Sequence, residues 1–132
     1  QLGRLFQFVR ERRKLAKIYS DLLRKRTSIL FMDPETHRGA NWQSYPVRIP
    51  GMGRELQLRI LRDMLAKGVA TRSGIMNSHE EPAYAPQAWS LPESERSARE
   101  TILLPLFPGM RETTIERIVE SLRLVIASCG KF

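Results

Sequence analysis

The sequence predicts a small α+β domain, in which helices cover one sheet of three or four strands. Three observations predict this class. Apolar residues recur at helical spacing near both ends of the chain and in its middle. Short apolar runs bounded by Gly and Pro lie between those helices. A length of 132 residues fits one domain with one core, so we assign residues 1–132 to a single domain.

The helices are expected where the apolar period is clearest, at about 2–25, 54–67, 93–101 and 112–128. Pro92, followed by acidic residues, suits the first turn of the third helix. Gly68 and Gly130 follow the second and last helices, and glycine commonly terminates a helix. A far-UV spectrum of a mainly disordered chain would contradict this assignment.

The strands are expected at 28–33, 42–49 and 69–72. Pro34 ends the first of them. Pro46 lies inside the second and indicates an edge position or a bulge, because proline cannot donate to a strand ladder. The run Ile102–Phe107 is too short and too rich in proline for a helix, and no element is assigned to it.

The excess positive charge is concentrated at the amino-terminal end. Residues 1–26 contain nine Lys or Arg and two acids, which accounts for +7 of the net +8. One interpretation is a stand-alone nucleic-acid or anion-binding module. The other is a solvated helix face, or a face that meets an acidic partner domain. Neither an aromatic–basic RNA motif nor zinc-ligand spacing accompanies the charge, so we do not expect a nucleic-acid partner.

Several classes of protein do not fit the sequence. Cys129 is the single cysteine, so no internal disulfide forms, and a reducing, cytoplasmic location is expected. No apolar run approaches the roughly 20 residues that span a bilayer, and no metal site is expected. The chain enters helical periodicity at residue 1 without Met or a capping residue. We therefore expect residue 1 to be a cut, made by proteolysis or by design, and the chain to be the carboxy-terminal part of a longer protein.

The stretch 68–84 holds the best candidates for binding chemistry. It has no apolar period across its middle, so it is expected to form a shaped loop. Arg72 is the residue type that binds a phosphate or carboxylate with a fork of donors, and a plain surface arginine is the alternative. His79 lies beside two glutamates, so a structural hydrogen bond is as plausible as a functional one. His37 is expected to be solvated and Cys129 inert.

No lysine of the chain is expected to attach a cofactor. A lysine that forms a Schiff base needs a desolvated pocket that depresses its pKa. The five lysines lie on the basic helix, before a helix-ending glycine or in the tail, at positions 14, 17, 25, 67 and 131. The residues alone therefore indicate no catalytic machinery in this chain.

A series of motifs runs along nearly the whole chain. They are Gln1-Leu-x-Arg-Leu-x-x-Phe-Val-x-x-Arg-Arg-x-Leu-Ala-x-x-Tyr19, Asn41-Trp-Gln-Ser-Tyr-x-Val-Arg48, Leu61-x-x-Met-Leu-x-x-Gly-Val-x-Thr-Arg72, Ser73-Gly-Ile-Met-x-x-His-x-x-Pro-x-Tyr84 and Leu91-Pro-x-Ser-Glu95. This order resembles the small carboxy-terminal domain of the DegT/DnrJ/EryC1/StrS aminotransferases. Those are pyridoxal-phosphate enzymes that aminate keto-sugars, usually nucleotide-linked. The family often has two arginines before the loop glycine, where this chain has Arg72-Ser73.

The resemblance implies a mostly antiparallel sheet, as in the small domain of fold-type I pyridoxal-phosphate enzymes. It places the Schiff-base lysine and the other cofactor-binding residues in a large amino-terminal domain, which this chain lacks. The full-length enzyme would be a homodimer acting on a keto-sugar and an amino-acid donor. What carries over is a contribution to the substrate pocket, which implicates Arg72 and His79, with Gln43 and Ser44 as weaker candidates. Arg72 and His79 are expected to lie within one pocket of the intact enzyme, on the side of this domain that faces the cofactor. Leu2, Leu5 and Phe6 would then pack on the large domain and be exposed here. A purely structural domain is the remaining alternative.

Overall fold

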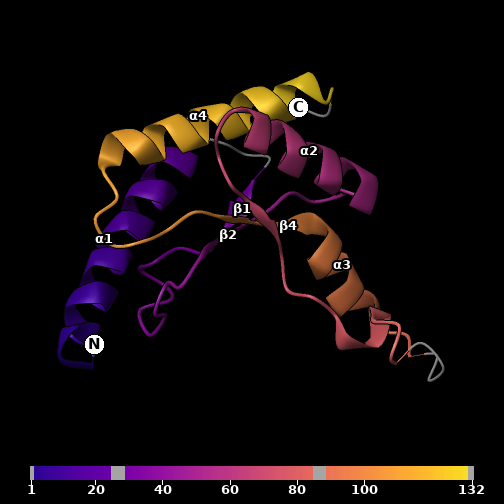
Figure 1. The fold of residues 1–132 in the computed structure, drawn as a ribbon, viewed down its shortest axis with the longest axis horizontal. Coiled ribbons are helices and arrows are strands. Elements are labelled where there is room, and N and C mark those ends of the chain that lie inside the picture. Colours follow the sequence, from indigo (N-terminus) through magenta and orange to yellow (C-terminus); the bar gives the residue numbers. More distant parts are fainter. Residues whose placement is uncertain (1, 25–28, 85–88, 131–132) are drawn as a thin grey trace.

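The expected α+β class is confirmed by a computed structural model, which describes residues 2–24, 29–84 and 89–130 (Figure 1). Its helices are α1 (Leu5–Leu23), preceded by the 3-10 turn η1 (Leu2–Arg4), α2 (Arg54–Ala66), α3 (Pro92–Glu100) and α4 (Glu112–Ser128). Its strands are β1 (Leu30–Phe31), β2 (Tyr45–Arg48), β3 (Arg72–Ser73) and β4 (Thr101–Leu104). They form one antiparallel sheet in the order β1-β2-β4-β3.

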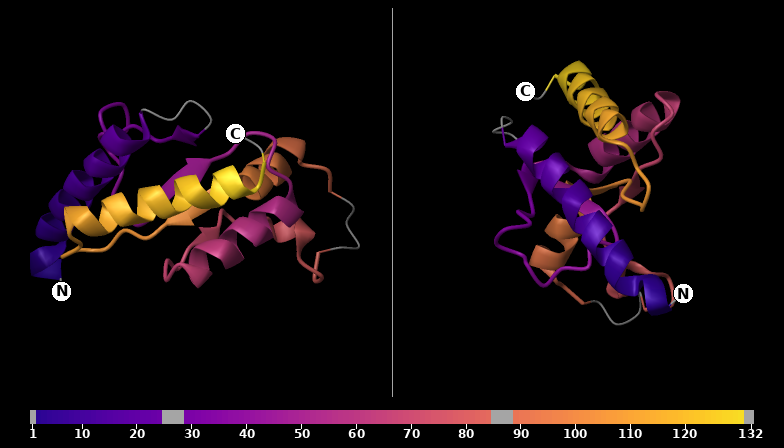
Figure 2. Two further views of the ribbon diagram at one scale, coloured as in Figure 1. Left: turned by 90° about the horizontal axis from the view of Figure 1, so that it is seen from above. Right: turned by 90° about the vertical axis from the view of Figure 1, so that its left-hand side faces the viewer.

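One face of the sheet carries the core. α4 packs against both α1 and α2, and the three helices form a layer over the strands (Figures 1 and 2). The side chains that alternate inward from β2 and β4 are buried: Tyr45, Val47, Ile102 and Leu104. Tyr19 of α1 stacks on Tyr45 with ring centroids 4.7 Å apart, and its hydroxyl donates to the carbonyl oxygen of Pro105 at 2.7 Å.

The other face of the sheet is only partly covered. Pro46, Arg48, Thr101 and Leu103 alternate outward and are half-buried. They line a groove of about 490 Å³ together with β1, Ile75 and Ser97. α3 packs against α2 and lies outside the layer that α1, α2 and α4 form.

Two strands begin later than the sequence predicts. Trp42 has a left-handed backbone with φ of 53°, and the Gln43 amide donates to Oδ1 of Asn41 at 3.2 Å, so the strand expected at 42–49 begins at Tyr45. The start predicted for the strand at 69–72 is also too early. The Val69 amide donates to the carbonyl oxygen of Met64 at 3.0 Å and completes the carboxy-terminal cap of α2. Pairing with β4 therefore starts only at Arg72. Of the strand expected at 28–33, residues 30–31 pair, and residue 28 lies outside the described residues.

The expectation that Pro46 marks an edge strand or a bulge is wrong, because β2 lies inside the sheet. The Ile49 amide donates to the carbonyl oxygen of Glu100 at 2.8 Å. Alternate residues of an antiparallel strand bond to opposite neighbours, so Pro46 faces the β1 side. On that side β1 pairs only with Val47 and Arg48. The missing amide hydrogen of Pro46 therefore costs the sheet no hydrogen bond.

The sequence prediction also missed β4, which occupies an interior position of the sheet. α3 ends at Glu100 and β4 begins at Thr101, with no residue between them. The junction is held by Gln57, which is fully buried and whose side-chain amide donates to the carbonyl oxygens of Ala98 and Thr101 at 2.7 and 2.8 Å. A strand that follows a helix without a turn lacks the Gly and Pro boundaries from which strands are predicted.

Glu100 links this junction to β2. Its carboxylate lies 2.6 Å from the Arg48 guanidinium and accepts from the Gly51 amide at 2.8 Å. Burial alone raises the pKa of Glu100, but the Gly51 amide and the Arg48 charge outweigh it, and the pKa lies below its usual range.

Replacing Glu100 with Gln is expected to lower the free energy of unfolding at neutral pH by about 1.5–3 kcal/mol, the scale of hydrogen bonds to a charged group. Because the folded-state pKa is lowered, this contribution is complete above the unfolded value of about 4.3 and is lost as the pH falls through the folded value. Urea denaturation at neutral pH and at about pH 3 should show the difference between wild type and variant shrinking in acid. Glu116→Gln, at an exposed position of α4, is the control. An equal difference at both pH values would contradict the assignment.

The amino-terminal end of α1 is exposed, as expected. Leu5 is 48% and Phe6 84% exposed, and the side chain of Leu2 lies outside the described residues. Some of the basic charge of α1 is neutralised within the domain, because Lys17 pairs with Asp21 and Arg24 with Asp33. No helix in the described parts of the chain is both long and apolar enough to cross a membrane.

Candidate functional site

The candidate loop leaves the sheet directly after β3. The Gly74 amide donates to the carbonyl oxygen of Thr101 at 3.0 Å, the same oxygen that accepts from Gln57. A Cβ at position 74 would lie 2.8 Å from Cβ of Thr101, so only glycine allows this close approach to β4. The chain is therefore fixed to the sheet at Gly74 before it continues into the 3-10 turn η2 (Ser78–Glu80).

His79 lies in η2, and its side chain is only 10% exposed. Its ring nitrogen Nε2 lies 3.3 Å from Oε1 of Glu95 in α3, and the same oxygen accepts from the Leu91 amide at 3.1 Å. A carboxylate partner favours a proton on Nε2, which leaves Nδ1 as the nitrogen for another contact. His79 thus joins the loop to α3, which is the structural role left open by the sequence.

A second set of polar contacts joins the same two segments. The Asn77 side chain donates to Glu80 at 2.8 Å, and Arg99 of α3 reaches Glu80 at 3.1 Å and Glu95 at 3.6 Å. Hydrogen bonds from Asn77 and Arg99 lower the pKa of Glu80. We call these residues the brace: Asn77, His79, Glu80, Glu95 and Arg99. The brace holds the loop against α3 from η2 onwards.

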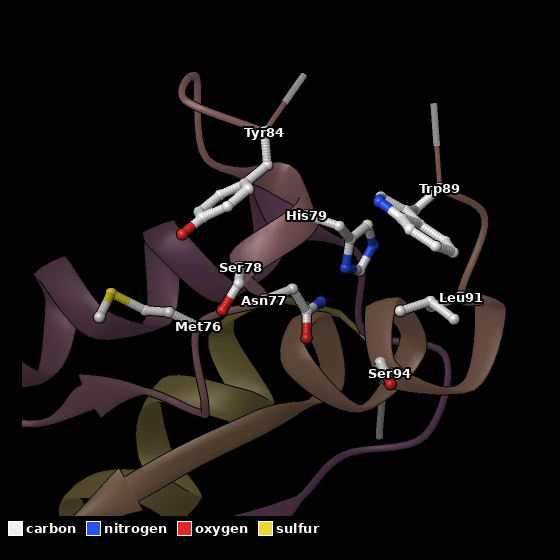
Figure 3. A pocket seen from close by; sticks show the side chains of 8 residues that line it. All are labelled: Met76, Asn77, Ser78, His79, Tyr84, Trp89, Leu91 and Ser94. Carbon is white, nitrogen blue, oxygen red and sulfur yellow. The ribbon is translucent and has the colours of Figure 1, made fainter. Parts of the chain in front are cut away.

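A pocket of about 470 Å³ opens beside the brace, and Figure 3 shows its lining. In that view the ring of His79 stands between the rings of Tyr84 and Trp89. Met76 and Leu91 add apolar surface, and Asn77, Ser78 and Ser94 add polar groups. The pocket combines aromatic faces with a few hydrogen-bonding groups, an arrangement typical of sites for organic ligands.

Arg72 is not among the residues that line this pocket. It is exposed on the edge strand β3, and its side chain makes no hydrogen bond or ion pair with any residue that the structure describes. Gln43 is exposed, and Ser44 is half-buried in the groove on the outward face of the sheet, where Ile75 of the same loop also lies. The structure thus brings Ser44 near the loop that carries His79, while Arg72 lies at the edge of the sheet without an ion-pair partner among the described residues.

The remaining candidates of the sequence keep modest roles. His37 is exposed and bonds locally to Asp33, and Cys129 is half-buried. Within the described ranges no three His, Cys, Asp or Glu side chains gather as metal ligands would. Sequence reasoning missed Glu95 and Arg99. Their spacing of four residues indicates an ion pair on a helix, but nothing in the sequence links either of them to His79.

A model of the DegT/DnrJ/EryC1/StrS aminotransferase family matches residues 1–123. The chain belongs to this family. It is 25% identical over 126 residues to the dTDP-4-dehydro-2,3,6-trideoxy-D-glucose 4-aminotransferase of Saccharopolyspora spinosa, across 96% of this chain and 32% of that protein. The chain thus spans about a third of the length of this relative.

Solved structures of aminotransferases share the fold. The aminotransferase TlmJ from Streptoalloteichus hindustanus superposes with a TM-score of 0.84 at 28% identity, over 98% of this chain and 35% of that one. The PLP-form of a putative sugar aminotransferase, Spr1654 from Streptococcus pneumoniae, superposes with a TM-score of 0.87 at 18% identity, over 97% of this chain and 33% of that one. The second likeness shows the fold alone.

The described lysines of this family member do not fit the attachment of pyridoxal phosphate. Lys14, Lys17 and Lys67 are exposed, and Lys17 pairs with Asp21, whereas a lysine that forms a Schiff base must be desolvated. Positions 25 and 131 lie outside the described residues. The described lysines therefore offer no attachment point for the cofactor.

Proposed function

We propose that this chain is the carboxy-terminal small domain of a pyridoxal-phosphate-dependent aminotransferase that acts on a nucleotide-linked keto-sugar. The observation that carries the proposal is the family match over residues 1–123 by a chain that spans only a third of its relatives. The Saccharopolyspora spinosa relative is named for a dTDP-linked dehydro-sugar, and the Spr1654 structure is a PLP-form. In the proposed enzyme the cofactor and its lysine belong to a large domain outside this chain.

This chain would contribute to binding the substrate. Arg72 offers a charged fork of donors at the exposed edge of β3, with no competing partner among the described residues. His79 would position the substrate through the ring nitrogen that does not face Glu95, and Gln43 and Ser44 would add weaker contacts from the segment before β2. A transamination assay of the full-length protein with a nucleotide-linked keto-sugar and an amino-acid donor tests the proposal. Absence of amine transfer with a range of such sugars would overturn it.

The exposed apolar side chains at the start of α1 support an attached large domain. Phe6 and Leu5 project from a helix whose later turns are buried, and with Val9, Arg10 and Arg13 they line a pocket of about 450 Å³. Exposed apolar surface of this kind usually marks an interface. In the proposed enzyme these side chains pack on the large domain, and the full-length protein forms a homodimer.

The 132-residue chain alone is expected neither to retain pyridoxal phosphate nor to transaminate, because its described lysines are exposed. Gel filtration of the chain with excess cofactor, followed by an absorbance spectrum, measures retention. The full-length protein treated in the same way is the control. Stoichiometric cofactor that borohydride fixes onto one lysine of the isolated chain would contradict this prediction.

His79→Ala is expected to lower kcat/KM of the full-length enzyme. The loss should correspond to less than about 1.5 kcal/mol of transition-state stabilisation, because an uncharged donor makes a weaker hydrogen bond than a charged group. Since the same substitution removes the contact with Glu95, the free energy of unfolding must be measured alongside. His79→Gln keeps a donor near Glu95 and separates the two roles. A loss larger than that of Arg72→Ala would contradict the proposed order of importance.

A further inference from the structure

The two ring nitrogens of His79 have different surroundings. Nε2 lies 3.3 Å from Oε1 of Glu95, whereas Nδ1 has no hydrogen-bond partner among the described residues. Nδ1 is nevertheless not sealed from solvent, because the buried polar side-chain atoms of the described residues that lack a partner are Nε of Arg12 and Oγ1 of Thr71. His79 also lines the pocket beside the brace. One ring nitrogen is therefore held by the protein, and the other is available to a ligand.

The contact with Glu95 decides which nitrogen carries the hydrogen. An ionised carboxylate can only accept hydrogen bonds, so the nitrogen that faces it must be a donor. A neutral imidazole has a single N–H group, and with that hydrogen on Nε2 the other nitrogen is an acceptor. At neutral pH and above, His79 therefore offers the pocket an acceptor, although a histidine in general can offer either.

The carboxylate of Glu95 is itself held from two sides. Its Oε1 also accepts from the amide of Leu91, which directly precedes α3, at 3.1 Å. Its Oε2 lies 3.6 Å from the guanidinium of Arg99, one turn further along the same helix. Glu95 cannot turn away from His79 without losing a contact with its own helix. The orientation of the carboxylate, and with it the tautomer of the imidazole, is thus fixed by α3.

Nothing near His79 in the described chain competes for Nδ1. The neighbouring carboxylate of Glu80 already has both oxygens bonded, to Arg99 at 3.1 Å and to Asn77 at 2.8 Å. The rings of Tyr84 and Trp89 stand on either side of the imidazole (Figure 3), and the side chain of His79 is only 10% exposed. The ring therefore has little room to turn over and exchange its two nitrogens.

We propose that Glu95 is a positioning residue of the substrate pocket, which fixes the tautomer of His79 so that Nδ1 accepts a hydrogen bond from a donor group of the substrate. The proposal rests on the proposed function, in which His79 contacts the substrate. An accepting nitrogen selects a hydroxyl or N–H group and makes no favourable bond with a carbonyl or phosphate oxygen. A nucleotide-linked sugar offers such donors in two places, namely the hydroxyl groups of the sugar and the N–H groups at the edge of the base.

Nitrogen NMR of this chain, produced with isotope-labelled histidine, tests the tautomer. The chain has two histidines, so His37→Asn assigns the signals. The spectra are recorded at about pH 8.5, where histidine is normally neutral. We expect His79 to show a single tautomer with the hydrogen on Nε2. His37 is the internal reference, because its Nδ1 lies 2.9 Å from the carbonyl oxygen of Asp33, which can only accept.

Two variants of α3 separate the role of Glu95 from that of the helix. Glu95→Gln has a side-chain amide that can donate as well as accept, so the ring-nitrogen signals of His79 should shift toward those of the other tautomer. Glu93→Gln removes a charge that pairs with Arg96 on the exposed side, and it should leave the signals unchanged. A hydrogen on Nδ1 of His79 in the wild type, or identical spectra for the wild type and Glu95→Gln, would overturn the proposal.

The substrate class is tested on the full-length protein with a nucleotide-linked keto-sugar, its monodeoxy analogues and an analogue methylated at the N–H of the base. For the analogue that lacks the donor facing Nδ1, the wild type should lose roughly 2- to 10-fold in kcat/KM, the scale of one uncharged hydrogen bond. This loss should shrink in Glu95→Gln, vanish in His79→Ala and persist in Glu93→Gln. A purely structural role of Glu95 would instead lower kcat/KM for every substrate by the same factor.

The pattern of losses also identifies the donor. A loss confined to one deoxy analogue assigns the donor to the sugar, and a loss confined to the methylated analogue assigns it to the base. Equal ratios of analogue to parent substrate in the wild type and in His79→Ala would overturn the proposal and leave the proposed function intact. Absence of amine transfer by the wild type would refute the proposed function and with it the substrate contact, whereas the NMR spectra would still report whether Glu95 fixes the tautomer.

Discussion

Arg72→Ala is expected to lower kcat/KM of the full-length enzyme by about 1.5–3 kcal/mol, or roughly 10- to 150-fold. The guanidinium of Arg72 is exposed on an edge strand and is bonded to no described residue, so its loss removes no hydrogen bond or ion pair within the described parts of the domain. A charge-assisted bond to an anionic or multiply hydroxylated substrate group would account for an effect of this size. Steady-state kinetics on a nucleotide-linked keto-sugar, with the cofactor absorbance checked as intact, provide the measurement.

Two further variants sharpen this experiment. Arg72→Lys should not restore full activity, because an ammonium group cannot reproduce the two parallel donors of a guanidinium. Arg117→Ala removes an arginine that is equally exposed, on α4, and should leave the kinetics unchanged. Wild-type kinetics for Arg72→Ala would favour the alternative that this domain is purely structural.

Tyr19→Ala is expected to lower the free energy of unfolding by about 3–5 kcal/mol, the usual cost of removing a buried aromatic side chain. Tyr19 is fully buried, stacks on Tyr45 and bonds to Pro105, so it joins α1 to the segment that follows β4. Tyr19→Phe keeps the ring but leaves the carbonyl oxygen of Pro105 without its donor, at an expected cost of about 1–3 kcal/mol.

Urea denaturation at neutral pH measures both Tyr19 variants. Tyr84→Ala is the control, because Tyr84 is half-exposed in the loop after η2 and its removal should change the stability by no more than about 0.5 kcal/mol. Burial raises the pKa of Tyr19, so its hydroxyl remains protonated and keeps its role as a donor in mildly alkaline solution. A loss below that of the control would show that α1 is not held by this contact.

The sequence predicted the helices well because their apolar periods coincide with the buried positions. Ile60 and Met64 of α2 and Ile115, Ile118 and Leu122 of α4 are buried, as the spacing predicts. β4 was missed because its boundaries depend on tertiary contacts. Gln57 fixes the change from helix to strand at Thr101, and no local signal in the sequence reports that contact.

The site was predicted only at the level of residue types. The loop and its candidates Arg72 and His79 follow from the irregular stretch after α2, whereas the partner of His79 does not. Glu95 lies sixteen residues further along the chain, and only the folded structure brings its carboxylate to the imidazole ring. We also expected Arg72 and His79 to share one pocket of the intact enzyme, but in this domain Arg72 does not line the pocket beside His79, because Arg72 pairs with Leu103 in the edge strand β3.

The loop after β3 and the end of α3 meet the sheet at one residue, Thr101, which restricts how these two segments can move. Gly74 is bonded to the carbonyl oxygen of Thr101, and α3 runs into Thr101 without a linker. A flap needs residues at its base that absorb changes of φ and ψ. Here one base is a strand ladder and the other is a helix continuous with an interior strand. Opening or closing at this side of the proposed enzyme would therefore require the whole domain to rotate as a rigid body.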